Sequence, residues 1–169
     1  MNLFETDRLQ VRLLTVDDAA FIVALLNDPA FLQYIGDRGV RTTGDAVAYL
    51  LKGPLASYAQ HGFGLFLVSL KADGIPIGIC GLLKRDVLED VDIGFAFLPA
   101  YVGKGYAFEA ACATLDYGRT IHGLKRIVAV TSPTNASSIR LLEKLGLRYE
   151  KRVQLSPGAP EIKLLGRNF

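Results

Sequence analysis

Several short stretches of this chain alternate apolar with polar residues, which is the pattern of half-buried β-strands. Leu9, Val11 and Leu13 alternate with Gln10 and Arg12 and predict a first strand. Further strands are expected at residues 63–71, 75–84, 91–97, 127–131, 147–155 and 161–165. A turn at 72–74 joins two of them into a hairpin, which continues as a meander.

Other stretches show helical spacing of apolar residues or capping residues at their starts. We expect helices from Thr15 to about Asn27, from Thr42 towards Tyr58, from about Gly105 to Arg119, and from Asn135 to Leu145. Gly53-Pro54 should interrupt or kink the second helix, because proline lacks the backbone donor. The expected buried face of the third helix is Ala107, Phe108, Ala111, Cys112 and Leu115. This order predicts an α+β fold, with helices packed on one mixed sheet.

The composition is that of one globular domain, expected over residues 1–169. Half of the residues are apolar, and 19 Lys and Arg against 17 Asp and Glu leave a net charge of +2, which disfavours a nucleic-acid partner. The start of the chain lacks the pattern of an export signal, and Pro54 breaks the longest uncharged stretch, 53–70. We therefore expect a cytoplasmic protein with no membrane partner, in which Cys80 and Cys112 are buried thiols.

The strongest chemical feature is a glycine-rich turn between an expected strand and an expected helix. In FLPAYVGKGYA, Gly103 and Gly105 lead the chain into the first helical turn. Glycine lets the backbone approach a bulky anion, and the free N–H groups of a helix start point towards it. The turn predicts a pyrophosphate site, although it also fits a turn that binds nothing. Phe108 excludes a dinucleotide fingerprint, and Lys104 followed by glycine excludes a P-loop.

A second feature is the segment NASSIRLLEKLGL, which reads as a capped amphipathic helix. Asn135 is a good N-cap residue, and Ser138 stands at the N3 position. The expected buried stripe is Ile139, Leu142 and Leu145, and the basic pair is Arg140 and Lys144. Taken alone, this segment is equally an ordinary surface helix.

Together, GKGYAFEA and NASSIRLLEKLGL, about thirty residues apart, resemble the GNAT superfamily of acetyl-CoA-dependent N-acetyltransferases. ETDRLQVRLLTVDD and VDIGFAFLPAYVGKGYAFEA are similar to its ribosomal-protein N-terminal acetyltransferase branch. The resemblance covers roughly residues 5 to 150. It implies a mostly antiparallel sheet of about seven strands flanked by about four helices, in which the fourth and fifth strands, 91–97 and 127–131, splay apart.

The resemblance also implies how acetyl-CoA, the co-substrate, is held. Its pantetheine would enter the gap between the splayed strands and pair with the backbone near Phe95 and Phe97. The pyrophosphate would lie on the turn, and Asn135 would contact the cofactor from the facing helix. The turn consists of Val102, Gly103, Lys104, Gly105, Tyr106 and Ala107. The candidates for the 3′-phosphate, unless they are merely solvated, are Lys104, Arg140 and Lys144.

Acetyl transfer needs a base for the amine and a proton for the departing thiolate. The resemblance assigns Asp92 as the base, acting through water; the alternative is a solvated carboxylate at a strand edge. Many members carry a proton-donating Tyr where this chain has Leu142. Ser138 would then stabilise or protonate the thiolate, unless it only caps its helix and catalysis rests on proximity. Glu109 is interpreted as structural.

The expected function is acetyl transfer to a primary amine by direct attack in a ternary complex. The acceptor is a protein N-terminus or a small amine, and a polycationic acceptor would favour an acidic mouth made of Asp86, Glu89, Asp90 and Asp92. The alternative is a catalytically silent acyl-CoA-binding or interaction module, favoured by Leu142 and by Val102, which replaces the usual Arg or Gln. No metal is expected, and the chain is a monomer or a homodimer.

Overall fold

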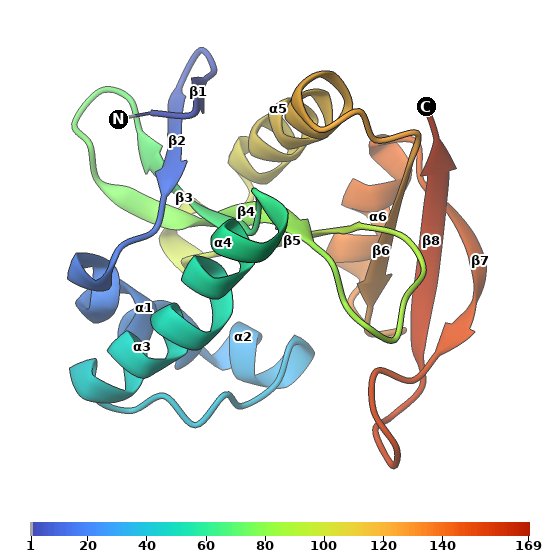
Figure 1. Cartoon of the computed structure of the whole chain (residues 1–169), viewed down its shortest axis with the longest axis horizontal. Coiled ribbons are helices and arrows are strands. Elements are labelled where there is room, and N and C mark those ends of the chain that lie inside the picture. Colours follow the sequence, from blue (N-terminus) through green and yellow to red (C-terminus); the bar gives the residue numbers. More distant parts are fainter. Residues whose placement is uncertain (1) are drawn as a thin grey trace.

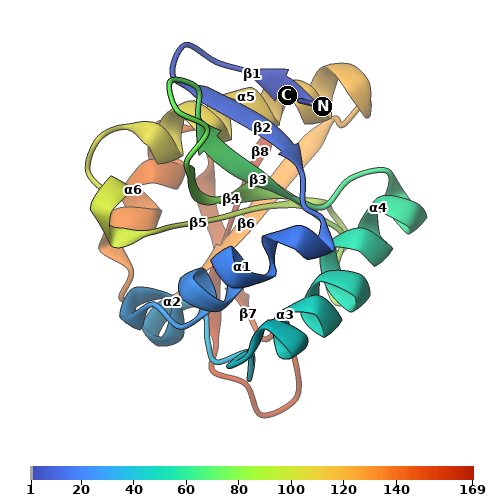
Figure 2. The same cartoon turned by 90° about the vertical axis from the view of Figure 1, so that its left-hand side faces the viewer.

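The computed structural model describes residues 2–169, and these form one eight-stranded sheet with helices on both faces (Figures 1 and 2). The strands are β1 (Phe4–Glu5), β2 (Leu9–Leu13), β3 (Leu65–Leu70), β4 (Pro76–Leu83), β5 (Asp92–Phe97), β6 (Arg126–Thr131), β7 (Arg148–Val153) and β8 (Ile162–Asn168). Their order across the sheet is β1-β2-β3-β4-β5-β6-β8-β7. Neighbours are antiparallel except β5 and β6, which run parallel. The predicted α+β class with a mixed, mostly antiparallel sheet is confirmed.

The helices are α1 (Ala19–Leu26), α2 (Pro29–Tyr34), α3 (Thr43–Leu50), α4 (Ala56–His61), α5 (Tyr106–Ile121) and α6 (Ala136–Lys144). Short 3₁₀ turns lie at η1 (Val16–Asp18) and η3 (Pro99–Tyr101). Thr15 and Thr42 cap η1 and α3, each through a capping box with an aspartate three residues later.

The sequence underestimates the number of elements. The short strand β1 pairs with β2 and adds to the expected seven, and α2 adds a helix capped by Asp28. The helix expected from Thr42 towards Tyr58 divides into α3 and α4, because Pro54 lies in a π-helical turn, η2 (Leu51–Leu55), between them. The expected interruption at Gly53-Pro54 is therefore confirmed.

Both faces of the sheet are buried, which explains the continuous apolar run in β3. Phe66 and Val68 pack on one side with α5, whereas Leu67 packs on the other side with α1 and α3. In Figure 2, α1, α2 and α3 lie below the sheet, α4 lies at its right-hand side, and α5 lies above it. A strand covered on both faces needs apolar residues at successive positions, so strict alternation is lost there.

The predicted buried face of α5 is confirmed for Ala111 and Leu115, but the buried face is rotated relative to the prediction, and Ala107 and Phe108 are only half-buried. The buried residues are Ala110, Ala111, Thr114, Leu115 and Gly118. Cys112 is exposed, so the prediction of a buried thiol is wrong for Cys112 and confirmed for Cys80. The cause is close packing on β4: the Thr114 hydroxyl lies 3.3 Å from the Cys80 sulfur, and a Cβ on Gly118 would come within 3.2 Å of Leu82. Small residues, not the most apolar ones, face the sheet.

Within residues 2–169, no helix is both long and apolar enough to cross a lipid bilayer.

Candidate functional site

The strands β5 and β6 pair only at one end and then diverge. Their one register pair is Asp92 with Val128, where the Val128 N–H donates to the Val91 carbonyl at 3.1 Å. In both views β6 then turns away from β5 (Figures 1 and 2). The predicted splaying of these two strands is confirmed.

The gap opens into a cleft of about 620 Å³. Its walls come from β5, β6 and α6, from residues around α2, and from the loop between β7 and β8. Asp92, Phe95, Asn135 and Ser138 line this cleft together. The structure thus brings residues from distant parts of the chain, singled out from the sequence, into one cavity.

One edge of β5 is free inside this gap. The Leu98 N–H donates to the carbonyl of Ile77 in β4 at 2.9 Å. Because successive N–H groups of a strand point to opposite edges, those of Phe95 and Phe97 face the side from which β6 has diverged. Among residues 2–169, β6 forms no register pair with either residue. This edge is therefore open to an extended chain that adds as a strand.

The glycine-rich turn follows directly after β5 and η3. Gly103 and Gly105 have φ angles of 80° and 84°, a left-handed conformation that glycine adopts at least cost. No backbone N–H from Gly103 to Phe108 donates to a described backbone carbonyl. A Cβ on Gly103 would meet no atom within 4 Å. These free donors at the start of α5, with open space beside them, fit a pyrophosphate.

Arg8, at the start of the chain, fixes this turn from outside. Its Nη1 donates to the Lys104 carbonyl at 3.0 Å, and its Nε lies 2.7 Å from Glu109 Oε1. The guanidinium also lies 4.4 Å from the Tyr106 ring centroid, and Glu109 accepts a further hydrogen bond from the Thr6 hydroxyl. These contacts support the interpretation of Glu109 as a structural residue. Sequence reasoning missed Arg8, since about a hundred residues separate it from the turn.

The helix α6 begins inside the cleft. Asn135 Oδ1 accepts the Ser138 N–H at 3.2 Å, so the predicted N-cap is confirmed. Ser138 is half-buried and its hydroxyl makes no hydrogen bond to another described side chain or backbone group. Leu142 also lines the cleft wall, but it is 1% exposed and belongs to the core. Its hydrocarbon side chain has no proton to donate.

Asp92 is buried at the closed end of the gap and is not a solvated edge carboxylate. Its side chain is 1% exposed, and its Oδ1 lies 3.2 Å from Arg85 Nε. Burial raises the pKa of Asp92 to about 6, although the nearby Arg85 charge lowers it in part. A carboxyl with such a pKa gains and loses its proton near neutral pH, as a general base must. Arg85 is the partner that sequence reasoning missed.

The expected basic contacts to a phosphate stay on the surface. Lys104, Arg140 and Lys144 are exposed, and Lys144 Nζ lies 4.2 Å from the ring centroid of Phe108 on α5. That contact places the end of α6 beside the start of α5. Val102 is 61% exposed, and its apolar side chain offers no hydrogen bond to a phosphate beside the turn.

The prediction that four carboxylates form an acidic mouth to the cleft is wrong. Asp86 and Glu89 are exposed and do not line the cleft, while Asp90 is paired with Arg126 at 3.1 Å. Only Asp92 among them lines the cleft, and it is paired. The four residues are close in sequence, but Leu88 in the loop before β5 packs on Val128 and Leu164, and Asp90 is held by Arg126 outside the cleft.

Comparison with known proteins points to one family. Residues 8–148 match the family model described as an acetyltransferase (GNAT) domain. The uncharacterised N-acetyltransferase YnaD of Bacillus subtilis is 34% identical over 145 residues, which cover 86% of this chain and 82% of YnaD.

Solved structures share the whole fold. RimL, a ribosomal L7/L12 alpha-N-protein acetyltransferase solved in complex with coenzyme A, superposes with a TM-score of 0.84 at 13% identity, covering 99% of this chain and 98% of RimL. The spermidine N-acetyltransferase of Vibrio cholerae, solved with coenzyme A and spermine, gives 0.78 at 20% identity, with 96% of each chain covered. By the match over residues 8–148 and the splayed sheet with its glycine-rich turn, this chain belongs to the GNAT family of acetyltransferases.

Proposed function

We propose that the protein transfers an acetyl group from acetyl-CoA to a primary amine, by direct attack while both substrates are bound. The observation that carries this proposal is the free β5 edge, which ends in a turn of unpaired N–H groups and shares a cleft with Asp92 and Ser138. The sheet continues through residues 4–168, which supports one N-acetyltransferase domain. RimL and the spermidine enzyme, which share the fold, are both solved with coenzyme A.

Each part of the site has a binding role in this proposal. The N–H groups of Phe95 and Phe97 hold the pantetheine arm, and one of them polarises the thioester carbonyl as an oxyanion-type donor. The free N–H groups of residues 103–107 hold the pyrophosphate, whereas the Val102 N–H donates to the Pro99 carbonyl. Arg8 keeps the turn in place. Asn135 contacts the co-substrate through its amide nitrogen, because its oxygen is used for capping.

Asp92 moves a proton, and Ser138 stabilises the leaving thiolate. When acetyl-CoA is bound it supplies the thioester, whose carbon the amine nitrogen attacks. Asp92 takes the proton from the amine through water, and the bond between the acetyl carbon and sulfur breaks. Ser138, which has a free hydroxyl at the cleft wall, donates a hydrogen bond to the leaving thiolate, which then takes its proton from solvent water.

An amine panel tests the function against the silent-module alternative. Acetyl-CoA should raise the melting temperature of the protein, and free thiol should be released with at least one amine from a panel of Ala- and Ser-starting peptides, spermidine and amino acids. Stabilisation without thiol release on every amine would favour the silent module. Absence of both responses would contradict the proposal.

Replacing Ser138 with alanine should lower kcat and leave the acetyl-CoA Kd nearly unchanged. The hydroxyl acts on the thiolate, whereas the cap uses the Ser138 backbone N–H, which alanine retains. We expect kcat to fall about tenfold, the order of one lost hydrogen bond to a charged group. Steady-state kinetics and calorimetric titration measure the two quantities. Ser137→Ala, at the exposed neighbouring position, is the matched control; an unchanged kcat in Ser138→Ala leaves Ser138 as a cap only.

A further inference from the structure

A second cavity of about 260 Å³ adjoins the cleft. The two cavities share Tyr49, Leu65, Leu83 and Arg85, so they lie side by side, and we call the two together the groove. The far walls of the second cavity come from η2 and α4. In the proposed function, acetyl-CoA occupies the β5 edge, the glycine-rich turn and α6. This groove is the space that remains for the amine acceptor.

The groove carries mainly positive charge. Its cationic lining residues are Arg38, Lys52, Lys84 and Arg85, and among the described residues its only lining carboxylate is Asp92. Asp92 is already paired with Arg85. The Lys84 ammonium donates to the backbone carbonyls of Arg85 and Leu88 at 2.9 and 2.6 Å, which carry no compensating charge. An excess of positive charge therefore faces the acceptor.

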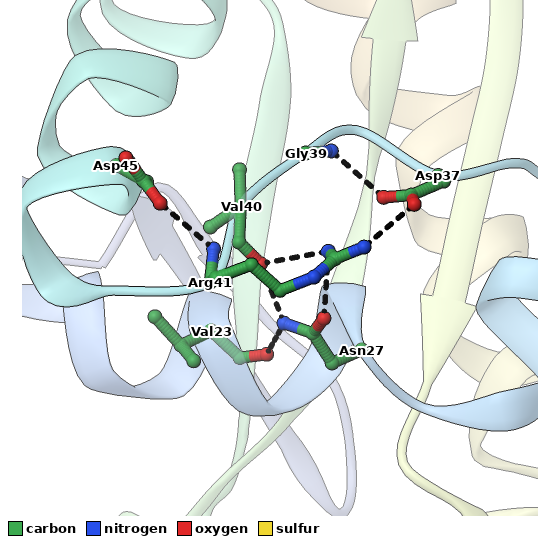
Figure 3. A network of polar contacts seen from close by, with 7 residues as sticks. All are labelled: Val23, Asn27, Asp37, Gly39, Val40, Arg41 and Asp45. Atoms are coloured by element: carbon green, nitrogen blue, oxygen red, sulfur yellow. Dashed lines mark hydrogen bonds and ion pairs between the residues drawn. The ribbon is translucent and has the colours of Figure 1, made fainter.

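Arg38 is the cation of the cleft that has no partner. Within residues 2–169 it forms no ion pair, and its side chain is exposed at the cleft wall. The adjacent Asp37 does not neutralise it, because that carboxylate accepts from Arg41 Nη2 at 2.6 Å and from the Gly39 N–H at 2.8 Å (Figure 3).

The same network fixes the segment that carries Arg38. Asn27, at the end of α1, donates through Nδ2 to the carbonyls of Val23 and Val40, both at 2.7 Å. Arg41 Nη1 donates back to Asn27 Oδ1 at 2.9 Å (Figure 3). Because both ends of this loop are tied to helices, the backbone beside Arg38 is held in place at the cleft. With the backbone already fixed, binding an anion costs only the ordering of the Arg38 side chain and not that of the loop.

We infer that the acceptor is a small molecule that carries, besides its primary amine, an anionic carboxylate or phosphate group, which Arg38 binds. This inference rests on the proposed N-acetyltransferase function. Guanidinium groups bind both kinds of oxyanion through paired hydrogen bonds. A polyamine would have to place its further ammonium groups beside Arg38, Lys52 and Lys84, where no free carboxylate receives them.

Matched acceptor pairs test this inference on the wild-type protein. β-Alanine is compared with β-alaninamide, and phosphoethanolamine with ethanolamine, at equal concentrations of free amine; spermidine is the polycation. We expect kcat/KM to be at least about tenfold higher for one anionic member than for its neutral partner, corresponding to about 1.4 kcal/mol. The preferred pair tells carboxylate from phosphate. Preference for spermidine or for both neutral amines overturns the inference and leaves the proposed function intact, whereas turnover of no amine, here or among peptides, overturns both.

Charge reversal then tests the assigned residue. Arg38→Glu should remove the preference for the anionic amine, a loss of about tenfold in kcat/KM or more, while acetyl-CoA still raises the melting temperature as in wild type. Lys125→Glu makes the same change in net charge at an exposed position outside both cavities and should keep the preference. An Arg38→Glu enzyme that still prefers the anionic amine overturns the assignment.

Discussion

Gly105→Glu is expected to abolish measurable acetyl-CoA binding. The new carboxylate would stand at the start of α5, where it would accept hydrogen bonds from the free N–H groups and repel the pyrophosphate. Two unit charges 4 Å apart near a protein surface repel by about 4 kcal/mol, which corresponds to about a thousandfold in Kd. Calorimetric titration with acetyl-CoA measures the effect.

Gly105→Gln is the matched control for this variant. Any side chain at Gly105 is strained, since its φ is 84° and a Cβ would lie 3.2 Å from Arg8 Nη2. Glutamine and glutamate share that strain and nearly the same shape, so the difference between their Kd values reports charge alone. Undiminished binding in Gly105→Glu would show that the pyrophosphate lies elsewhere.

Asp92→Asn is expected to lower kcat/KM by about 100-fold or more, the usual contribution of a general base. In the wild type, the pKa of Asp92 is about 6 and the ionised form is active, so kcat/KM should rise with pH through about 6. The variant should lack this limb of the profile. The separate rise caused by the acceptor's own ionisation should remain in both proteins.

Stability should vary with pH in the opposite sense. The folded-state pKa of Asp92, about 6, lies above the ordinary aspartate value of 3.8, so between these values the folded protein binds more protons than the unfolded chain. The free energy of unfolding therefore falls as pH rises from about 4 to about 6, by at most about 3 kcal/mol from this group. Chemical unfolding should show this dependence in the wild type and not in Asp92→Asn.

Asp90→Asn provides the control for both experiments. Asp90 is also paired with an arginine, Arg126, but its side chain is 38% exposed and lies outside the cleft. This variant should keep the wild-type limb near pH 6. If Asp92→Asn keeps that limb too, the base is another group and Asp92 serves only to pair with Arg85.

Local patterns were sufficient for most of the elements and for the glycine-rich turn. The first strand, 9–13, has the bounds of β2, and the helix expected from Asn135 to Leu145 agrees with α6, Ala136–Lys144, to within one residue at each end. The glycine-rich turn and the Asn135 cap are also local, because a left-handed residue or a capping side chain acts on backbone groups a few residues away. Such features leave a signature in a short window of sequence.

Contacts between distant segments left no such signature. The hydrogen bond from Arg8 to the Lys104 carbonyl joins the segment around residue 8 to the turn before α5. Neither segment has a sequence pattern that indicates this contact. The buried face of α5 was misjudged for the same reason, since Thr114 and Gly118 face β4 because the helix packs closely there. Packing against a partner surface overrides the helix's own apolar pattern.

Residue order therefore settled the family, the splayed sheet and the glycine-rich turn, all of which rest on short-range backbone conformation and on recurring motifs. The chemistry of the cleft came from the folded arrangement. Burial raised the pKa of Asp92 beside Arg85, and the pairing of Asp37 with Arg41 left Arg38, at the cleft wall, without an ion-pair partner among residues 2–169. Burial and charge balance depend on which residues surround a group in space, and neighbours in space are not neighbours along the chain.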